Sequence, residues 1–142
     1  MLNKTEESKT FVNLGVVLNK KGEVLIIRRR VLESGSDGSV LKWAFPGGKQ
    51  KYDETREQCV KREILAETGY DVIPKKQISL RLHPQFLITV VYHLCSLNFP
   101  NPIAQPKELH EIAEIKWVKP EEILTLFTTD FDPKVKQELG LQ

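Results

Sequence analysis

The stretch Gly48–Tyr70, with the sequence GKQKYDETREQCVKREILAETGY, decides the fold because it joins a glycine-marked turn to the clearest helix in the chain. That helix is predicted to span Glu54–Thr68. Asp53 or Thr55 can cap its start, and the latter is followed three residues later by a glutamine, which is the spacing of a capping box. Gly69 is placed to end the helix, because glycine readily adopts the left-handed conformation of a C-terminal cap.

Two glutamates of this helix fall on the side predicted to face inward. On a helical wheel measured from Cys59, Glu63 lies at about 40° and Glu67 at about 80°. Both lie one turn apart inside the stripe that carries Cys59 and Val60. Burying neighbouring carboxylates is unfavourable unless a positive charge neutralises them. A hard cation such as Mg²⁺ would do so, because it favours carboxylate oxygens and also binds substrate phosphates.

The alternative is that Arg56, Arg62 and nearby lysines pair with these glutamates and no metal is bound. A helix with both charge types favours such pairs at spacings of three and four residues. Judged on the helix alone, the ion-pair interpretation is slightly favoured.

Strand-like stretches surround the helix, and further helices follow at the C-terminus. Leu41–Phe45 is a short apolar stretch that runs into a backbone break at Pro46-Gly47-Gly48. The expected strands are Phe11–Leu18, Glu23–Arg29, Gln77–Leu82, Phe86–Leu97 and Glu114–Val118. The expected later helices are Pro120–Leu126 and Asp132–Leu139, and the expected loops are Leu32–Val40 and Asn98–Lys107. This order favours a mixed α/β layered domain.

Composition excludes several classes of protein. The length of 142 residues suits one domain over the whole chain, with residues 1–10 as a flexible polar segment that lacks the apolar core of a signal peptide. The net charge of +2 is too small to indicate a nucleic-acid polymer or a membrane as partner. Cys59 and Cys95 are too few for a disulfide framework and suggest buried thiols in a reducing compartment. We therefore expect a cytoplasmic protein.

The spacing of the central stretch matches a longer pattern. Its fixed positions are Gly48, Glu54, Arg62, Glu63, Ile64, Glu67, Gly69 and Tyr70. They resemble the Nudix box G-x5-E-x7-R-E-U-x-E-E-x-G-U, in which U is a bulky apolar residue, of the MutT-like Nudix hydrolases. Phe45-Pro46-Gly47-Gly48 matches the usual lead-in to the box. One fixed position departs, because Ala66 stands where the family has the first glutamate of its E-E pair.

The resemblance implies an α/β/α sandwich with a mixed sheet and a catalytic loop–helix–loop. It also implies hydrolysis of a phosphoanhydride bond in a nucleoside diphosphate linked to another moiety, with Mg²⁺ or Mn²⁺. The substrate would be a nucleoside triphosphate such as an oxidised dNTP, or ADP-ribose or another sugar nucleotide. The sequence leaves the oligomeric state open, with a homodimer as one option.

Roles for individual residues follow from the same resemblance. Glu63 and Glu67 would be metal ligands, and Glu63 or a carboxylate near it would help to deprotonate the attacking water. Arg62 would orient the carboxylates by pairing with Glu54. A further carboxylate often comes from a later loop in this family. Glu111 is the best candidate for it, followed by two other glutamates, Glu108 and Glu114.

Other residues are candidates for contacts with the substrate. Gly47 and Gly48 lie in the turn before the helix, and Arg28 and Arg30 lie near the end of the second strand. Alternation along that strand sends Arg29 to the opposite face, so only some of the three arginines can reach a phosphate or ribose. The aromatic residues that could stack on a base are Trp43, Phe86 and Tyr92.

Two other functions remain open at this point. Loss of the carboxylate at Ala66 is compatible with a Nudix-fold nucleotide-binding or regulatory domain that does not hydrolyse its ligand. An α/β domain whose glutamates are merely paired is the third option, and the length of the motif argues against it. Joint retention of Glu54, Arg62, Glu63 and Glu67 favours the enzyme.

Overall fold

The computed structural model describes residues 11–141, so the prediction for residues 1–10 lies outside the described part of the chain. The first strand, β1 (Phe11–Leu18), is built from residues that are buried on both faces. The other strands are β2 (Val24–Ser34), β3 (Val40–Ala44), β4 (Gly47–Lys49), β5 (Val72–Leu82), β6 (Thr89–Leu97) and β7 (Ile112–Val118). The helices are α2 (Arg56–Thr68), α3 (Pro120–Leu126) and α4 (Pro133–Glu138).

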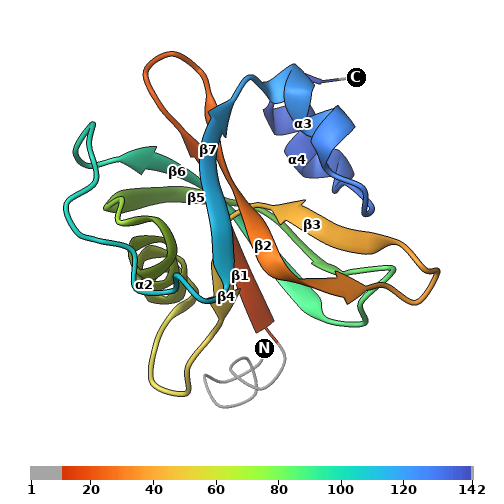
Figure 1. Cartoon of the computed structure of the whole chain (residues 1–142). Coiled ribbons are helices and arrows are strands. Elements are labelled where there is room, and N and C mark those ends of the chain that lie inside the picture. Colours follow the sequence, from red (N-terminus) through yellow and green to blue (C-terminus); the bar gives the residue numbers. More distant parts are fainter. Residues whose placement is uncertain (1–10, 142) are drawn as a thin grey trace.

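The strands form one mixed sheet with the order β3-β2-β1-β6-β5, in which β4 also pairs with β1 and β7 also pairs with β2. Among the strands within residues 11–141, only the β1–β6 pair is parallel, and the other pairs are antiparallel. Helix α2 lies on one side of the sheet, and α3 and α4 lie on the other (Figure 1). This is the α/β/α sandwich that the resemblance to the Nudix hydrolases implied, and it agrees with the mixed α/β domain expected from the order of elements.

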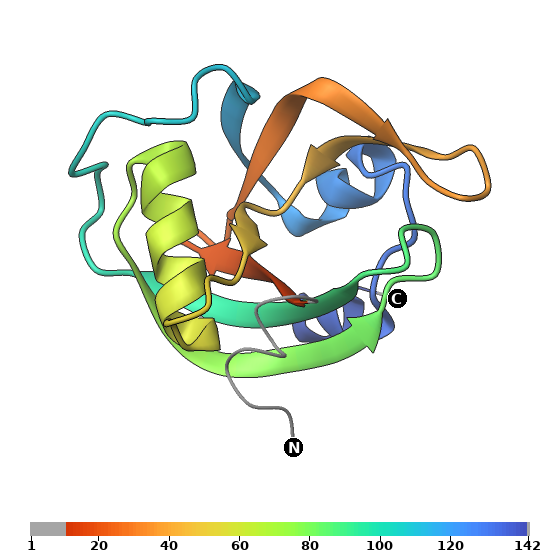
Figure 2. The ribbon, with the colours of Figure 1, turned by 90° about the horizontal axis from the view of Figure 1, so that it is seen from below.

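Two hydrophobic clusters hold these layers together. Val17 of β1 faces α2 and packs with Val60 and Ile64 of that helix. Its neighbour Val16 faces the other way and packs with Ile123 of α3 and Val135 of α4, as the period-2 alternation of a strand requires. The view in Figure 2 shows α2 standing apart from the C-terminal helices across the strands. None of the helices in the described residues has both the length and the apolar character that a membrane crossing requires.

Several boundaries differ from the sequence predictions. Strand β2 continues to Ser34 because Glu33 and Ser34 pair with the start of β3, which shortens the predicted loop Leu32–Val40. Strand β5 starts at Val72 because it pairs with β6 along its length. The predicted strand Phe86–Leu97 begins only at Thr89, since the residues before it form the turn between β5 and β6.

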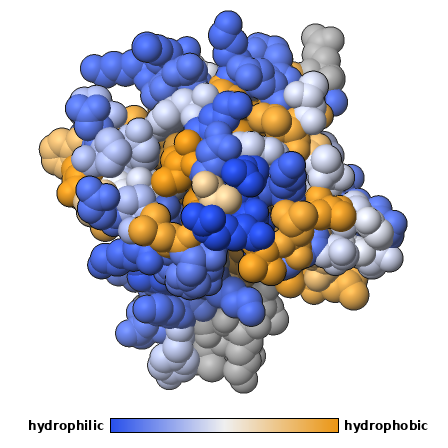
Figure 3. Space-filling view, in the orientation of Figure 1, coloured by the Kyte–Doolittle hydropathy of each residue, from blue (hydrophilic) through white to orange (hydrophobic). Residues whose placement is uncertain are grey.

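Apolar side chains gather on the right of the face in Figure 3, over the β2–β3 hairpin.

Candidate active site

The turn and helix that carry the site are fixed by local capping. The side chain of Thr55 accepts a hydrogen bond from the backbone N–H of Gln58, and the Gln58 side chain accepts one from the Thr55 N–H. This capping box confirms Thr55 as the cap, and the helix begins at Arg56 rather than at the predicted Glu54. Gly69 ends it with φ of 80°, and its N–H donates to the carbonyl of Leu65. Helix α2 is therefore held at both ends, and its Glu63 and Glu67 lie against Gly48 and Gly47 of β4.

Glu67 is a buried carboxyl without an ion-pair partner. Its side chain is 6% exposed, and its Oε1 accepts a hydrogen bond of 2.7 Å from the N–H of Gly47. Among residues 11–141, no lysine, arginine or histidine forms an ion pair with it. The pKa of Glu67 is raised to about 8, chiefly by burial and also by the nearby Glu63 and Glu111, against the lowering effect of the Gly47 N–H. Such a carboxyl has a strong tendency to bind either a proton or a cation.

Glu63 lies beside the same turn and is partly buried. Its Oε1 accepts a hydrogen bond of 2.5 Å from Nη1 of Arg62. A Cβ atom added to Gly48 would lie 2.7 Å from both Cδ and Oε2 of Glu63, so only glycine leaves room for this carboxylate. Gly47 has a separate constraint, since its φ is 150° and a Cβ there would lie 2.0 Å from the carbonyl oxygen of Asn13.

Arg62 links two of the box carboxylates. Its Nε and Nη2 donate to the two carboxylate oxygens of Glu54 at 2.9 and 2.7 Å, which is the bidentate geometry typical of arginine. This confirms the predicted Arg62–Glu54 pair. The hydrogen bonds from Arg62, together with one from the N–H of Lys51, hold the pKa of Glu54 below its usual value. Ion pairing thus accounts for Glu54 and Glu63 but leaves Glu67 unpaired.

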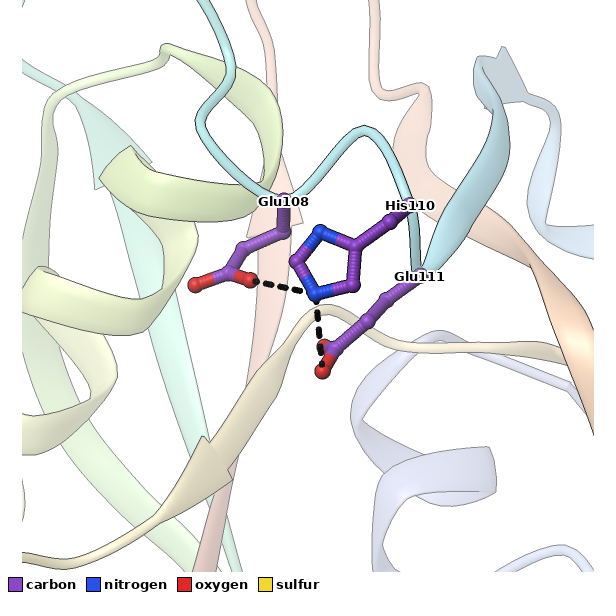
Figure 4. Close-up of side chains that lie close together, drawn as sticks. All are labelled: Glu108, His110 and Glu111. Atoms are coloured by element: carbon purple, nitrogen blue, oxygen red, sulfur yellow. Dashed lines mark ion pairs between the residues drawn. The ribbon is translucent and has the colours of Figure 1, made fainter.

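A second group of possible ligands lies on the loop before β7. The His110 ring lies between the carboxylates of Glu108 and Glu111 (Figure 4), and its Nε2 is 3.9 Å from an oxygen of Glu108 and 3.6 Å from one of Glu111. One ligand atom from each of the three residues lies within 4.8 Å of the others. Glu111 is close enough to act on the pKa of Glu67. Glu114, in contrast, pairs with Arg28 at 3.3 Å on the strand itself.

A cavity of about 370 Å³ opens beside Glu67. Gly47 and Gly48 line it, as do the three aromatic residues that were proposed to stack on a base, Trp43, Phe86 and Tyr92. Its remaining aromatic lining comes from Phe45, Phe127 and Phe131. A concave and mostly apolar site with a few polar and charged groups is the usual form of a small-molecule site.

The arginines of β2 are arranged differently from the expectation. Arg29 lines the cavity, whereas Arg28 and Arg30 do not. Arg28 pairs with Glu114 and lies over the ring of Trp43, and Nε of Arg30 donates to the carbonyl of Leu109 at 2.7 Å. Alternation along the strand correctly separated Arg29 from its neighbours but did not show which face looks into the cavity.

One part of the cavity lining was not anticipated from the sequence. Asp130 and Asp132, from the segment between α3 and α4, line its far end. Arg81 of β5 pairs with both of them, at 2.6 Å with Asp130 and 3.2 Å with Asp132. Ser79 donates a hydrogen bond of 2.8 Å to the buried Asp132. No motif marks these residues, and only their placement in the fold brings them to the site.

Comparisons with known proteins agree with this geometry. An 8-oxo-dGTP diphosphatase from Proteus vulgaris is 39% identical over 104 residues, covering 72% of this chain and 88% of that protein. A Bacillus subtilis (strain 168) relative is 30% identical over 105 residues, and the match covers 74% of this chain but only 63% of that relative, less than two thirds of its length. A solved MutT protein from Methanosarcina mazei Go1 has a TM-score of 0.64 at 25% identity, over 92% of this chain and 90% of that chain. Residues 11–139 match the NUDIX domain, and the chain therefore belongs to the NUDIX domain family.

Proposed function

We propose that this chain is a pyrophosphohydrolase that cleaves a phosphoanhydride bond in a nucleoside diphosphate linked to another moiety, with Mg²⁺ or Mn²⁺ as cofactor. The observation that carries the proposal is the unpaired, buried carboxyl of Glu67, which lies next to Glu63 at the mouth of an aromatic cavity. The pKa of Glu67 is raised chiefly because the carboxyl is buried, and the negative charges of Glu63 and Glu111 add to the effect. A divalent cation would relieve that unfavourable burial.

The residues present fit such a cation. Glu63 and Glu67 would hold it from α2, and Glu111 would approach from the loop before β7. When bound, the cation would neutralise charge on the phosphate oxygens and lower the pKa of a coordinated water. An all-carboxylate set suits Mg²⁺ and Mn²⁺.

The protein's own groups have distinct tasks in this proposal. Arg62 donates one hydrogen bond to Glu63, and its Nε and Nη2 donate two to Glu54. The Glu63 carboxylate is therefore oriented before the substrate arrives. Glu63 would accept the proton of the attacking water. Arg29, which lines the cavity, would bind a phosphate oxygen. The fixed network contributes position and electrostatics rather than a covalent intermediate.

The cavity favours a nucleotide among phosphate esters, because its aromatic lining can stack on a base. Trp43 and Phe86 offer faces for stacking, and Asp130 at the far end can accept hydrogen bonds from base amino groups. The 39% identical relative, named as an 8-oxo-dGTP diphosphatase, supports a nucleoside triphosphate such as an oxidised dNTP ahead of a sugar nucleotide. We also propose that the chain acts as a single domain on small nucleotides.

A product assay over a panel of nucleotides tests the proposal. The panel would contain normal and oxidised dNTPs, NTPs, ADP-ribose and UDP-sugars, each with Mg²⁺, with Mn²⁺ and with EDTA. We expect release of a nucleoside monophosphate with at least one substrate, no release with EDTA and none from the Glu67→Gln variant. Binding of nucleotides without turnover under every metal condition would instead favour a regulatory domain.

A further inference from the structure

Three segments of the chain meet at one end of the aromatic cavity. They are the β2–β3 loop (residues 35–39), the β5–β6 turn (residues 83–88) and the segment between α3 and α4 (residues 127–132). All three lie on the right of Figure 2. The second and third supply lining residues, including Phe86 and Asp130, and the strands next to the first supply Glu33 and Leu41. Their relative positions therefore set the shape of the cavity.

Gln85 lies where these segments meet, and all four of its polar groups are hydrogen-bonded. Its backbone N–H donates to Nδ1 of His83 at 3.1 Å within the turn. Its carbonyl accepts from the N–H of Ser36 at 2.7 Å, and its Nε2 donates to a carboxylate oxygen of Asp37 at 2.8 Å. Its Oε1 accepts from the N–H of Asp130 at 2.6 Å. One side-chain amide thus joins the β2–β3 loop to the α3–α4 segment.

The β2–β3 loop also packs closely against Gln85. A Cβ atom added to Gly35 would lie 2.9 Å from Cβ of Gln85 and 2.7 Å from Oγ of Ser39. The turn itself holds Leu87 in the left-handed region with φ of 53°, which residues other than glycine seldom adopt. The contacts of the turn, rather than its intrinsic preference, therefore fix its conformation.

We propose that Gln85 is a positioning residue that sets the width of the cavity, and thereby the affinity for a nucleobase and the choice between bases. The inference rests on the proposed function, in which the cavity receives the base. Gln85 does not line the cavity, so it acts through Phe86 and Asp130, which do. Without its side chain the three segments can separate, and only a fraction of molecules retains the binding-competent cavity. The apparent Kd then rises by the inverse of that fraction.

The effect should appear in KM rather than in kcat, because the carboxylates of α2 are held by a separate network of hydrogen bonds. We expect Gln85→Ala to raise KM about 5- to 10-fold, as the loss of two hydrogen bonds predicts, and to leave kcat within about twofold. Discrimination between purine and pyrimidine triphosphates should fall as well. Gln105→Ala is the matched control, since Gln105 lies on the exposed loop between β6 and β7 and outside the cavity.

The contact between Gln85 and Asp37 can be tested by placing a second negative charge there and then removing the first. Gln85→Glu keeps an acceptor for the Asp130 N–H but places a carboxylate against Asp37, so KM should rise at least as much as in Gln85→Ala. Adding Asp37→Asn should bring KM back toward the wild-type value, because an amide can donate to the new carboxylate and still accept from the Ser39 N–H. A purely structural role would not give this rescue.

Gly35→Ala should push the β2–β3 loop away from Gln85, because the new Cβ would lie 2.9 Å from Cβ of Gln85. Its effect on KM should be less than multiplicative with that of Gln85→Ala, because both act on one contact. The inference is overturned if Gln85→Ala has the KM and base selectivity of Gln105→Ala, or if Asp37→Asn gives no rescue.

Binding measurements separate this inference from the proposed function. Calorimetric titration with a hydrolysis-resistant nucleoside triphosphate analogue gives Kd for each variant without turnover. If wild type binds but hydrolyses nothing, the proposed function fails and the Kd values alone decide the inference. If wild type hydrolyses a nucleotide and Gln85→Ala leaves KM and Kd unchanged, the inference alone fails. If wild type neither binds nor hydrolyses any nucleotide, both fail.

Discussion

Replacing Glu67 with glutamine should make the metal-free protein more stable, by an amount that grows with pH. Glutamine has nearly the same shape and can still accept the hydrogen bond from the Gly47 N–H. It cannot ionise, however, whereas the pKa of Glu67 rises from its usual 4.5 to about 8 on folding. The folded wild type therefore binds more protons than the unfolded chain between these pH values. By linkage its stability falls as pH rises from 4.5 to about 8 and then levels off.

The size of the effect follows from the shift. One pKa unit corresponds to about 1.4 kcal/mol, so the wild type carries a penalty of about 3 kcal/mol at pH 7 and about 5 kcal/mol above pH 8. At pH 5 the penalty is below about 1 kcal/mol. For a chain of this size, about 3 kcal/mol corresponds to roughly 6–12 °C in Tm. Glu67→Gln removes this penalty but also removes an anionic metal ligand, so turnover should be lost.

Thermal unfolding in EDTA at pH 5, 7 and 8.5 measures the gap in Tm between Glu67→Gln and the wild type. The measurement is then repeated with Mg²⁺. The gap should widen with pH in EDTA and narrow with Mg²⁺, which should stabilise the wild type by binding its folded state. Glu57→Gln, on the exposed side of the same helix, is the control and should follow the wild type. A variant no more stable than wild type, or a gap independent of pH, would refute the account of Glu67 as a buried, uncompensated carboxyl.

Three further substitutions probe the geometry around the carboxylates. Ala66→Glu should lower the Mg²⁺ concentration for half-maximal rate at an unchanged Tm, because Ala66 is only partly buried and borders an open concavity. Ala104→Glu, which adds the same charge from the facing loop, is the control. An unaltered metal titration in a folded Ala66→Glu variant would contradict this prediction. Gly48→Ala should lower kcat by about 10-fold or more with little change in Tm, because the new Cβ displaces only the end of the Glu63 side chain. Gly47→Ala should instead destabilise the fold, because its Cβ would collide with backbone. Full activity in Gly48→Ala would show that catalysis does not depend on the observed position of the Glu63 carboxylate.

Local signals in the sequence predicted the centre of the fold and the chemistry on it. The capping residues Thr55 and Gly69 delimit α2, because caps depend on residues close in the chain. The burial of Glu67 was expected from its spacing along the helix, and the pairing of Arg62 with Glu54 was expected from the resemblance to the Nudix box. The caps and the Arg62–Glu54 pair could be predicted because each joins residues that are close in the chain.

The features that were missed depend on contacts distant in sequence. Strand β4 has only three residues, two of them glycines, and it exists because β1 pairs with it. Arg29 rather than Arg28 faces the cavity, and a β-bulge between these two residues shifts the register with β7. Asp130 reaches the site because the C-terminal helices fold back over the sheet. Gln85 bonds to Asp37 and Asp130, which lie 48 and 45 residues away from it in the sequence. Such placements follow from tertiary packing, which local sequence patterns do not encode.

The most direct test of the central claim is to locate the cation. A crystal soaked in millimolar Mn²⁺, with anomalous data collected near the manganese absorption edge, would show where the ion binds. We predict a peak within coordination distance of the Glu63 and Glu67 carboxylates, and no such peak in a Glu67→Gln crystal soaked in the same way. Absence of a peak at these carboxylates in the wild-type crystal would contradict the assignment of Glu67 as a metal ligand and, with it, the proposed mechanism.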